Sequence, residues 1–429
     1  MNIASFFNPR SILLVGSSKA KETGMMVTPE IFRRVGINLR NFSGKLFVCD
    51  TGEKGEFPPC DLAVITLPPD KILEILPKLK TRCLLILSGG FNSEQRKQLK
   101  AFASRYRILG PNSVCGLLNT QNSLNTTFEG EMKMRPGKIS VVSQSGGIGV
   151  TILDYMISNS AGISKFAWIG DAVDVNECDL LEYLAADRQT KVILMYLESV
   201  RDPRRFMTVA RRSVKPVIIL KGGISEESKE RALTHTDSLS TDAEIYSAAF
   251  RQTGAIEVES VRELFNCGQL FERYERRTVN RIAIVSNTGG SSILASDFCH
   301  KLGLELAQLS EDTRRKITQK YPRIKVLNPI DMAADADGEG YKFVLDIVAK
   351  DRNVDAILII NQFKSCLLKP EELELLKRLK TGKIVVDCAP GDEDYKKAKF
   401  FLGDTFPIYS AVEDAVFVLK KAKDYGKRF

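Results

Sequence analysis

The chain has 429 residues, too many for one compact core, and 44% of them are hydrophobic, so we expect two to four packed domains. Its formal net charge is +9, but Lys and Arg are interleaved with Asp and Glu and no basic tail or aromatic-basic motif is present, which argues against nucleic-acid binding. The nine cysteines include no CxxC pair and are odd in number, so neither a zinc site nor a disulfide framework is indicated. No apolar run approaches the roughly 20 residues of a membrane span, and the first residues lack a secretory signal, so we expect a cytoplasmic protein without membrane attachment.

Three apolar, β-branched segments are each followed by a Gly-containing turn and then by a helix-compatible segment. This order is typical of the first strand, turn and helix of a parallel βαβ unit. The three segments and their turns are 11–15 with 16–18, 139–142 with 143–147, and 281–285 with 286–290.

After each of these three strand-turn-helix segments, continuous apolar runs alternate with amphipathic stretches. This pattern is typical of strands buried on both faces of a sheet and of the crossover helices that connect them. We therefore expect an α/β protein with three doubly wound domains. Linker-like composition at 130–137 and 272–280 sets the domains at 1–130, 131–275 and 276–429. The further predicted strands are 45–49, 62–67, 83–87, 191–197, 216–220, 356–360 and 383–387.

Ligands of such sheets bind beyond the carboxyl ends of the strands, where the turns lead into helix N-termini. The turn at 143–147 fits a phosphate well, because Gly and Ser before a helix leave backbone N–H groups accessible at the positive end of the helix dipole. The sequence leaves open an ordinary strand-to-helix turn in which Ser145 is only the helix cap.

The first turn, Gly16, Ser17 and Ser18, lacks the complete G-x-G-x-x-G spacing of a dinucleotide site. Asp50 ends the second strand, where an acid that binds a ribose would lie. An adenine nucleotide with its phosphate near Ser17, Ser18 and Lys19 is therefore possible. A plain turn with a solvated lysine explains the same residues.

Histidine chemistry is limited to two residues, His235 and His300. We expect no role for His300, on the helix after the third turn. His235 lies in a loop between hydroxyl side chains, where a functional residue and a surface histidine are both possible. Glu198 closes the strand at 191–197, so its carboxylate either orients an imidazole or faces water.

The order of these segments resembles the α subunit of ADP-forming acetyl-CoA and related acyl-CoA synthetases, within the succinyl-CoA synthetase superfamily, and the resemblance runs almost end to end. The motifs that carry it are DLAVI at 61–65, LSGGF at 87–91, LGPN at 109–112, SQSGG at 143–147, DLLEYL at 179–184, YLE at 196–198, THT at 234–236 and NPID at 328–331.

The resemblance implies an N-terminal Rossmann-like CoA-binding domain followed by two flavodoxin-like, succinyl-CoA synthetase-like domains. It implies that His235 is phosphorylated and that Glu198 steadies it, with no metal site in the chain. The residues implied to bind phosphate are Ser143, Gln144, Ser145, Gly146 and Gly147. The residues implied to bind CoA are Gly16, Ser17, Ser18, Lys19, Pro111 and Asn112.

The implied reaction is acyl-CoA plus phosphate plus ADP giving a carboxylic acid, CoA and ATP, reversibly, through an acyl phosphate and a phosphohistidine. CoA is then a substrate, and ATP, ADP and Mg²⁺ are bound mainly by a partner. The sequence has no Walker-type motif and no counterpart of the family's ATP-grasp domains, so we expect a separate ATP-grasp β subunit in an α2β2 assembly. No motif specifies the acyl group or distinguishes ADP from GDP.

The sequence departs from the family pattern at two places near the histidine. Asp237 stands where the family has Gly, and a carboxylate there repels a phosphoryl group unless it points away. The segment Lys221, Gly222, Gly223 and Ile224 replaces a Gly-Arg-containing stretch that is common in the family. Because of these departures, a second interpretation stays open, in which the chain is a CoA-binding regulatory or structural subunit that has lost the phosphoryl relay. A CoA-dependent transferase or oxidoreductase on the same folds is a third possibility.

Overall fold

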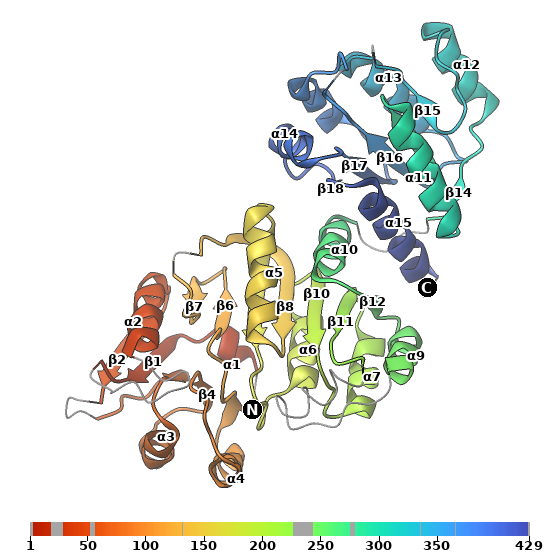
Figure 1. Ribbon diagram of the computed structural model, residues 1–429. Helices are drawn as coiled ribbons and strands as arrows, with labels where there is room; N and C mark the ends of the chain where they lie inside the picture. The colour runs from red at the N-terminus through yellow and green to blue at the C-terminus, as the bar shows by residue number, and fades with distance from the viewer. Residues whose placement is uncertain are drawn as a thin grey trace. The chain divides into compact units, whose positions relative to one another are not determined.

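The protein has a mixed α/β architecture with three largely parallel sheets (Figure 1). A computed structural model describes residues 3–18, 29–51, 56–130, 132–225, 243–274, 279–334, 336–364 and 366–427. The chain forms two compact units, residues 1–268 and 269–429. Within the described ranges, no helix has the length and apolar character needed to cross a membrane.

The first sheet of unit 1 has the order β2-β1-β3-β4-β5, with every pair parallel. Its central strands are apolar throughout because helices cover them and no residue of β3 or β4 reaches solvent. The strands are β1 (Ser11–Gly16), β2 (Lys45–Asp50), β3 (Leu62–Ile65), β4 (Cys83–Ile86) and β5 (Arg107–Leu109). The helices are α1 (Ala4–Phe7), α2 (Pro29–Asn38), α3 (Pro69–Ile75) and α4 (Ser93–Ala101), with 3-10 turns η1 (Leu39–Asn41), η2 (Leu76–Lys78) and η3 (Phe102–Ser104).

The second sheet of unit 1 has the order β12-β11-β10-β8-β9-β6-β7. Strands β8 to β12 are parallel, and the β6–β7 hairpin adds an antiparallel edge. The strands are β6 (Leu117–Asn119), β7 (Leu124–Asn125), β8 (Arg135–Ser143), β9 (Gly162–Trp168), β10 (Val192–Leu197), β11 (Val217–Lys221) and β12 (Ile256–Val258). The helices are α5 (Gly146–Ser158), α6 (Glu177–Ala186), α7 (Pro203–Arg212), α9 (Ala243–Thr253) and α10 (Val261–Arg273), which continues into unit 2.

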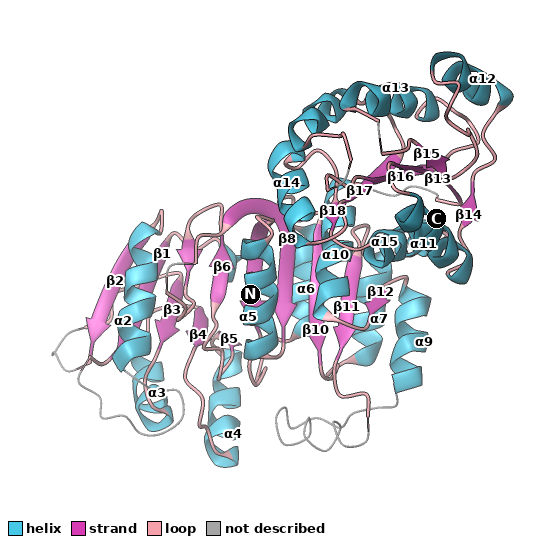
Figure 2. Cartoon of the chain, turned by 45° about the horizontal axis from the view of Figure 1, so that its top comes forward, coloured by secondary structure: helices cyan, strands magenta, loops and turns pink. Residues whose placement is uncertain are grey.

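The sheet of unit 2 has the order β14-β13-β16-β17-β18, with β15 paired to β13. Figure 2 shows its strands between α13 on one side and α11 with α15 on the other, so helices cover both faces. The strands are β13 (Arg281–Ser286), β14 (Glu305–Leu306), β15 (Ile330–Asp331), β16 (Ala356–Ile360), β17 (Ile384–Cys388) and β18 (Ile408–Tyr409). The helices are α11 (Gly289–Lys301), α12 (Glu311–Lys320), α13 (Gly338–Val348), α14 (Asp392–Leu402), α15 (Val412–Gly426) and the 3-10 segment η4 (Pro370–Arg378).

The ten strands predicted from apolar runs are confirmed, with ends that differ by a few residues. The β6–β7 hairpin precedes the predicted boundary at 130/131, and its β6 strand pairs with β9 of the second sheet. The boundaries at 130/131 and 275/276 stay predictions.

Candidate functional site

The turn at 143–147 joins the end of β8 to the start of α5 in Figure 1. Ser145 is the N-cap of α5, and its side chain accepts a hydrogen bond from the Ile148 N–H at 3.5 Å. The buried Ser143 Oγ donates to the Ser145 carbonyl at 2.6 Å. The turn is therefore closed by its own side chains, and the first N–H groups of a 13-residue helix follow it directly.

The two glycines of this turn meet different surroundings. A Cβ atom on Gly146 would lie 2.7 Å from the Trp168 ring, whereas a Cβ atom on Gly147 would have no neighbour within 4 Å. The Trp168 ring is held in place because its Nε1 donates to the Gln144 carbonyl at 3.1 Å. Gly146 therefore permits packing against β9, and the exposed Gly147 leaves the helix N-terminus open to an anion.

Gln144 links the turn to the neighbouring strand β10. Its Nε2 donates to the Ser199 carbonyl at 2.9 Å, while its Oε1 accepts from the N–H groups of Ser199 at 3.0 Å and Glu198 at 2.5 Å. This amide clamp fixes the backbone beyond β10 beside the turn. Glu198 is thereby brought to the same edge of the sheet as the start of α5.

The Glu198 side chain is only 9% exposed, so it is not the water-facing strand-end carboxylate that the sequence left open. Burial raises the pKa of the Tyr196 hydroxyl, and the charge of the nearby Glu198 carboxylate adds to the rise. On the other side, the buried Lys221 Nζ donates to the Glu198 carbonyl at 2.8 Å and also to the Gly222 carbonyl. Lys221 lies 4.5 Å from the centre of the Tyr246 ring, a cation–π contact.

His235 and Asp237 lie outside the described residues, in the connection 226–242, and Lys19 lies in another stretch that is not described, 19–28. That connection runs between β11, which ends at Lys221, and α9, which begins at Ala243. Because β11 is the direct neighbour of β10, the chain enters this connection one strand away from Glu198. The role of His235 stays a prediction.

The first predicted CoA segment forms the turn after β1. A Cβ atom on Gly16 would lie 2.1 Å from the Phe32 ring and 2.4 Å from Thr66 Oγ1, so no side chain fits there. The Ser18 N–H donates to Asp50 Oδ2 at 3.2 Å, which ties the turn to the end of β2. Ser17 lies between the closely packed Gly16 and the hydrogen-bonded Ser18.

The second predicted CoA segment, Pro111 and Asn112, follows β5. Asn112 has a positive φ of 61°, and its N–H donates to the Ser88 carbonyl at 2.8 Å. Its Nδ2 donates to Asp171 Oδ1 at 3.2 Å, and the Pro111 carbonyl accepts from the Asp171 N–H at 2.8 Å. Strands β3 and β4 separate β1 from β5, so the two CoA segments share one sheet edge at a separation of roughly 14 Å.

The third Gly turn, in unit 2, repeats the construction of the second. Ser286 Oγ donates to the Thr288 carbonyl at 2.9 Å, as Ser143 does to Ser145. Asn287 Nδ2 donates to the Gln362 carbonyl at 2.7 Å and its Oδ1 accepts from the Gln362 N–H at 3.0 Å, an amide clamp on the backbone beyond β16. His300 is exposed on the helix α11 that follows.

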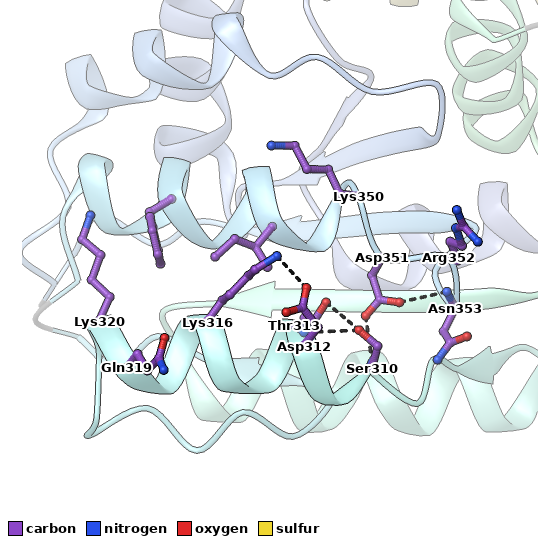
Figure 3. A pocket seen from close by; sticks show the side chains of 12 residues that line it. Ser310, Asp312, Thr313, Lys316, Gln319, Lys320, Lys350, Asp351, Arg352 and Asn353 are labelled. Atoms are coloured by element: carbon purple, nitrogen blue, oxygen red, sulfur yellow. Dashed lines mark hydrogen bonds and ion pairs between the residues drawn. The ribbon is translucent and has the colours of Figure 1, made fainter.

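A cavity of about 870 Å³ lies in unit 2 beside α12 and α13 (Figure 3). Its charged side chains are partly paired internally, since Lys316 Nζ lies 2.5 Å from Asp312 and Asp351 accepts from the Ser310 N–H at 2.9 Å. None of the predicted site residues lines it. Within the described part of the chain, no group of three or more His, Cys, Asp or Glu side chains is placed to hold a metal ion.

Residues 136–271, which contain the 143–147 turn and Glu198, match the model of the succinyl-CoA ligase-like flavodoxin domain. Over 462 aligned residues the chain is 33% identical to the α subunit of ADP-forming acetate–CoA ligase II of Pyrococcus furiosus, covering 98% of both chains. The chain belongs to the ADP-forming acetate–CoA ligase family.

Other members of the ADP-forming acetate–CoA ligase family differ in length. ADP-forming acetate–CoA ligase I of Archaeoglobus fulgidus is 32% identical over 424 residues, which are 92% of this chain but only 59% of that relative. The chain therefore spans less than two thirds of that longer protein. Among solved structures, a dinucleotide-forming acetyl-coenzyme A synthetase 1 of Ca. Korarchaeum cryptofilum, in complex with phosphate and ADP, superposes with a TM-score of 0.88 at 25% identity, covering 100% of this chain and 97% of that one.

In this member of the ADP-forming acetate–CoA ligase family, Glu198 lies beside the turn at 143–147, whose residues are predicted to bind phosphate. The described residues predicted to bind CoA lie on the first sheet. Sequence reasoning missed Tyr196, Lys221 and Asp171, which reach the predicted residues from neighbouring strands or loops. Only the position of Tyr196, two residues before Glu198 at the end of β10, gave a signal that the two residues lie close together.

Proposed function

We propose that the chain is the α subunit of an NDP-forming acyl-CoA synthetase that converts acyl-CoA, phosphate and ADP into a carboxylic acid, CoA and ATP, reversibly. The observation that carries this proposal is the buried Glu198, clamped beside an open helix N-terminus at the sheet edge from which the His235 connection starts. The full-length match to an α subunit supports it independently.

In the proposed reaction, phosphate attacks the acyl carbonyl carbon and CoA leaves as its thiolate, giving an acyl phosphate. One imidazole nitrogen of His235 then attacks phosphorus, and the carboxylate leaves with the electrons of the broken P–O bond. Glu198 accepts the N–H of the other ring nitrogen and so stabilises the charged phosphohistidine. The N–H groups at the start of α5 offset the charge on the phosphoryl oxygens.

We assign the transfer from phosphohistidine to ADP to an ATP-grasp β subunit that carries the nucleotide and Mg²⁺, in an α2β2 assembly located in the cytoplasm. The P. furiosus relatives are named α subunits, which supports a separate partner. The relatives' names favour acetate or 4-hydroxybutyrate as the acid. The choice of acid and of ADP over GDP belongs to this proposal.

CoA binding is proposed for Gly16, Ser17, Ser18, Lys19, Pro111 and Asn112. Support comes from the position of the Gly16 turn and of the fixed Asn112, which both follow parallel strands at the same edge of the first sheet. The finer fold proposal is a Rossmann-like first domain followed by two flavodoxin-like domains. The three sheets and the matched flavodoxin-like domain support that division.

The test is intact-mass and peptide mapping of the chain incubated with a family β subunit, ATP and Mg²⁺ under non-acidic conditions. A phosphoryl group on His235 that is discharged by acid substrate and CoA is the expected result. His235→Asn should abolish the adduct while CoA affinity stays within a few-fold, and His300→Asn is the matched control that retains it. Without an adduct on the wild-type chain beside an active partner, the CoA-binding subunit that lacks the relay becomes the better assignment.

A further inference from the structure

We propose that the cavity beside α12 and α13 in unit 2 binds a small organic anion that combines an apolar body with two negative charges. Its volume of about 870 Å³ lies within the range of about 300–1,000 Å³ in which proteins hold small molecules. None of the residues predicted to bind CoA or phosphate lines this cavity, so the proposal does not depend on the proposed function.

One wall of the cavity is apolar. Phe343 and Ile347 lie four residues apart on α13, so both side chains project from the same face of that helix. They are half-buried, because they pack from outside on the hydrophobic core of unit 2, and their remaining surface lines the cavity. A ligand gains free energy when its apolar body covers this surface and removes it from water.

The rest of the lining carries more positive than negative charge, with four cationic side chains against two carboxylates. Figure 3 shows Lys316 and Lys320 on α12 and Lys350 and Arg352 beyond the end of α13. Of these four cations, only Lys316 forms an ion pair with a described residue, Asp312 at 2.5 Å. Three cations therefore remain available to an anionic ligand.

Both carboxylates of the lining are already engaged. Asp312 also pairs with Arg315, at 2.7 Å. Asp351 is only 5% exposed and accepts from the N–H groups of Ser310 and Asn353, each at 2.9 Å. The bond to Ser310 ties the start of α12 to the loop after α13, so the two walls of the cavity are joined without a ligand.

Lys320 connects the charged and apolar parts of the lining. Its Nζ lies 4.1 Å from the centre of the Phe343 ring, a cation–π contact. The ring attracts the ammonium group but has no net charge, so it does not neutralise it. An anionic group that binds Lys320 thus lies beside the apolar wall, which favours a ligand with both properties over inorganic phosphate.

Equilibrium dialysis of the full chain against 1-naphthyl phosphate tests the site. This probe joins an apolar double ring to a phosphate monoester, which is doubly charged above about pH 7. Inorganic phosphate has only the charge and 1-naphthol only the ring, so each should bind at least about tenfold more weakly. Affinity for the probe should also fall as salt is added.

Variants locate the probe in the cavity. Lys320→Gln and Lys350→Gln should each weaken binding about threefold, the size expected for one exposed charge pair, and the double variant about tenfold. Asp312→Asn releases Lys316 and should strengthen binding about threefold. The matched control is Lys396→Gln, which removes an exposed lysine of α14 outside the cavity and should leave the affinity unchanged.

The gain expected for Asp312→Asn keeps the test decisive if a lysine variant fails to fold, since misfolding would not strengthen binding. Equal affinity in wild type, both lysine variants and Asp312→Asn would overturn the proposal, because the probe would then bind elsewhere. Equal affinity for 1-naphthol and for the probe would show that the cations take no part. Absence of binding at millimolar 1-naphthyl phosphate would also refute the site.

Discussion

Gly146 and Gly147 begin the same helix, yet a methyl group added to each meets a different environment. A Cβ atom on Gly146 would lie 2.7, 2.8 and 3.0 Å from three carbons of the Trp168 ring, about 1 Å inside van der Waals contact. The ring is 6% exposed and cannot withdraw without losing its hydrogen bond to the Gln144 carbonyl. Gly146→Ala should therefore disturb the amide clamp as well as the packing.

The expected loss in the free energy of unfolding of Gly146→Ala has three contributions. Overpacking costs about 1–3 kcal/mol and a weakened hydrogen bond about 1 kcal/mol, while replacing a helical glycine by alanine returns about 0.4–1 kcal/mol. The net loss for Gly146→Ala is about 2 kcal/mol, which lowers the Tm of a unit of this size by about 4 °C. Gly147→Ala has no clash and should leave stability unchanged or raise it by up to about 1 kcal/mol.

Thermal and urea unfolding of both variants, followed by circular dichroism, compare these values directly. Phosphohistidine formation by Gly146→Ala should fall about tenfold, because a shifted Gln144 no longer fixes the backbone of Glu198. Equal stability of the two variants would refute the argument, since it would show that Trp168 moves aside without cost. A stable Gly146→Ala variant with normal phosphorylation would remove the clamp from the mechanism.

Three further variants test other contacts. Burial raises the pKa of Asp387 from 3.8 to about 8. The stabilising contribution of its carboxyl group is therefore complete below about pH 4 and is lost as the pH rises to 8. In urea unfolding, the free energy of unfolding of Asp387→Asn should match that of wild type at pH 4 and exceed it at pH 8 by at most about 5 kcal/mol. Lys165→Met leaves the half-buried Asp187 carboxylate without its ion-pair partner at 2.7 Å and should cost about 3 kcal/mol in the same assay, most of which Asp187→Asn should restore. Unchanged stability would show that Asp187 is solvated. Asn112→Gly and Asn112→Ala should weaken CoA binding equally by calorimetry, about tenfold, whereas only the alanine variant should lose stability through its positive φ; unchanged affinity would exclude Asn112 from the CoA site.

The strands found from the sequence were those with nearly continuous apolar runs. Strand β9 was missed because Gly162, Ser164 and Lys165 interrupt its pattern. Lys165 is nevertheless 1% exposed, since Asp187 and Gln189 bind its ammonium group at 2.7 and 2.9 Å. A buried ion pair between distant residues cannot be recognised from the local pattern of one strand.

The same limit applies to the candidate site. Gly and Ser after an apolar run were sufficient to identify the 143–147 turn, because the residues that start a helix are neighbours in the sequence. The amide clamp of Gln144 depends on which strands are neighbours, and so does the close approach of Gly222 to Tyr196, where an added Cβ atom would lie 2.4 Å from the hydroxyl oxygen. That order, with β8 and β11 on either side of β10, is set by tertiary packing and is not encoded in any single motif.

The amide clamps of Gln144 and Asn287 suggest a rule for predicting sheet register in other chains of this architecture. An amide is a short side chain that both donates and accepts, so it can bind the N–H and the carbonyl of one facing residue, as it does at Ser199 and Gln362. A carboxylate in its place would repel the facing carbonyl. Asn or Gln between a buried strand and a Gly-Gly helix start therefore marks the level at which the adjacent strand ends, and so reports sheet register from sequence.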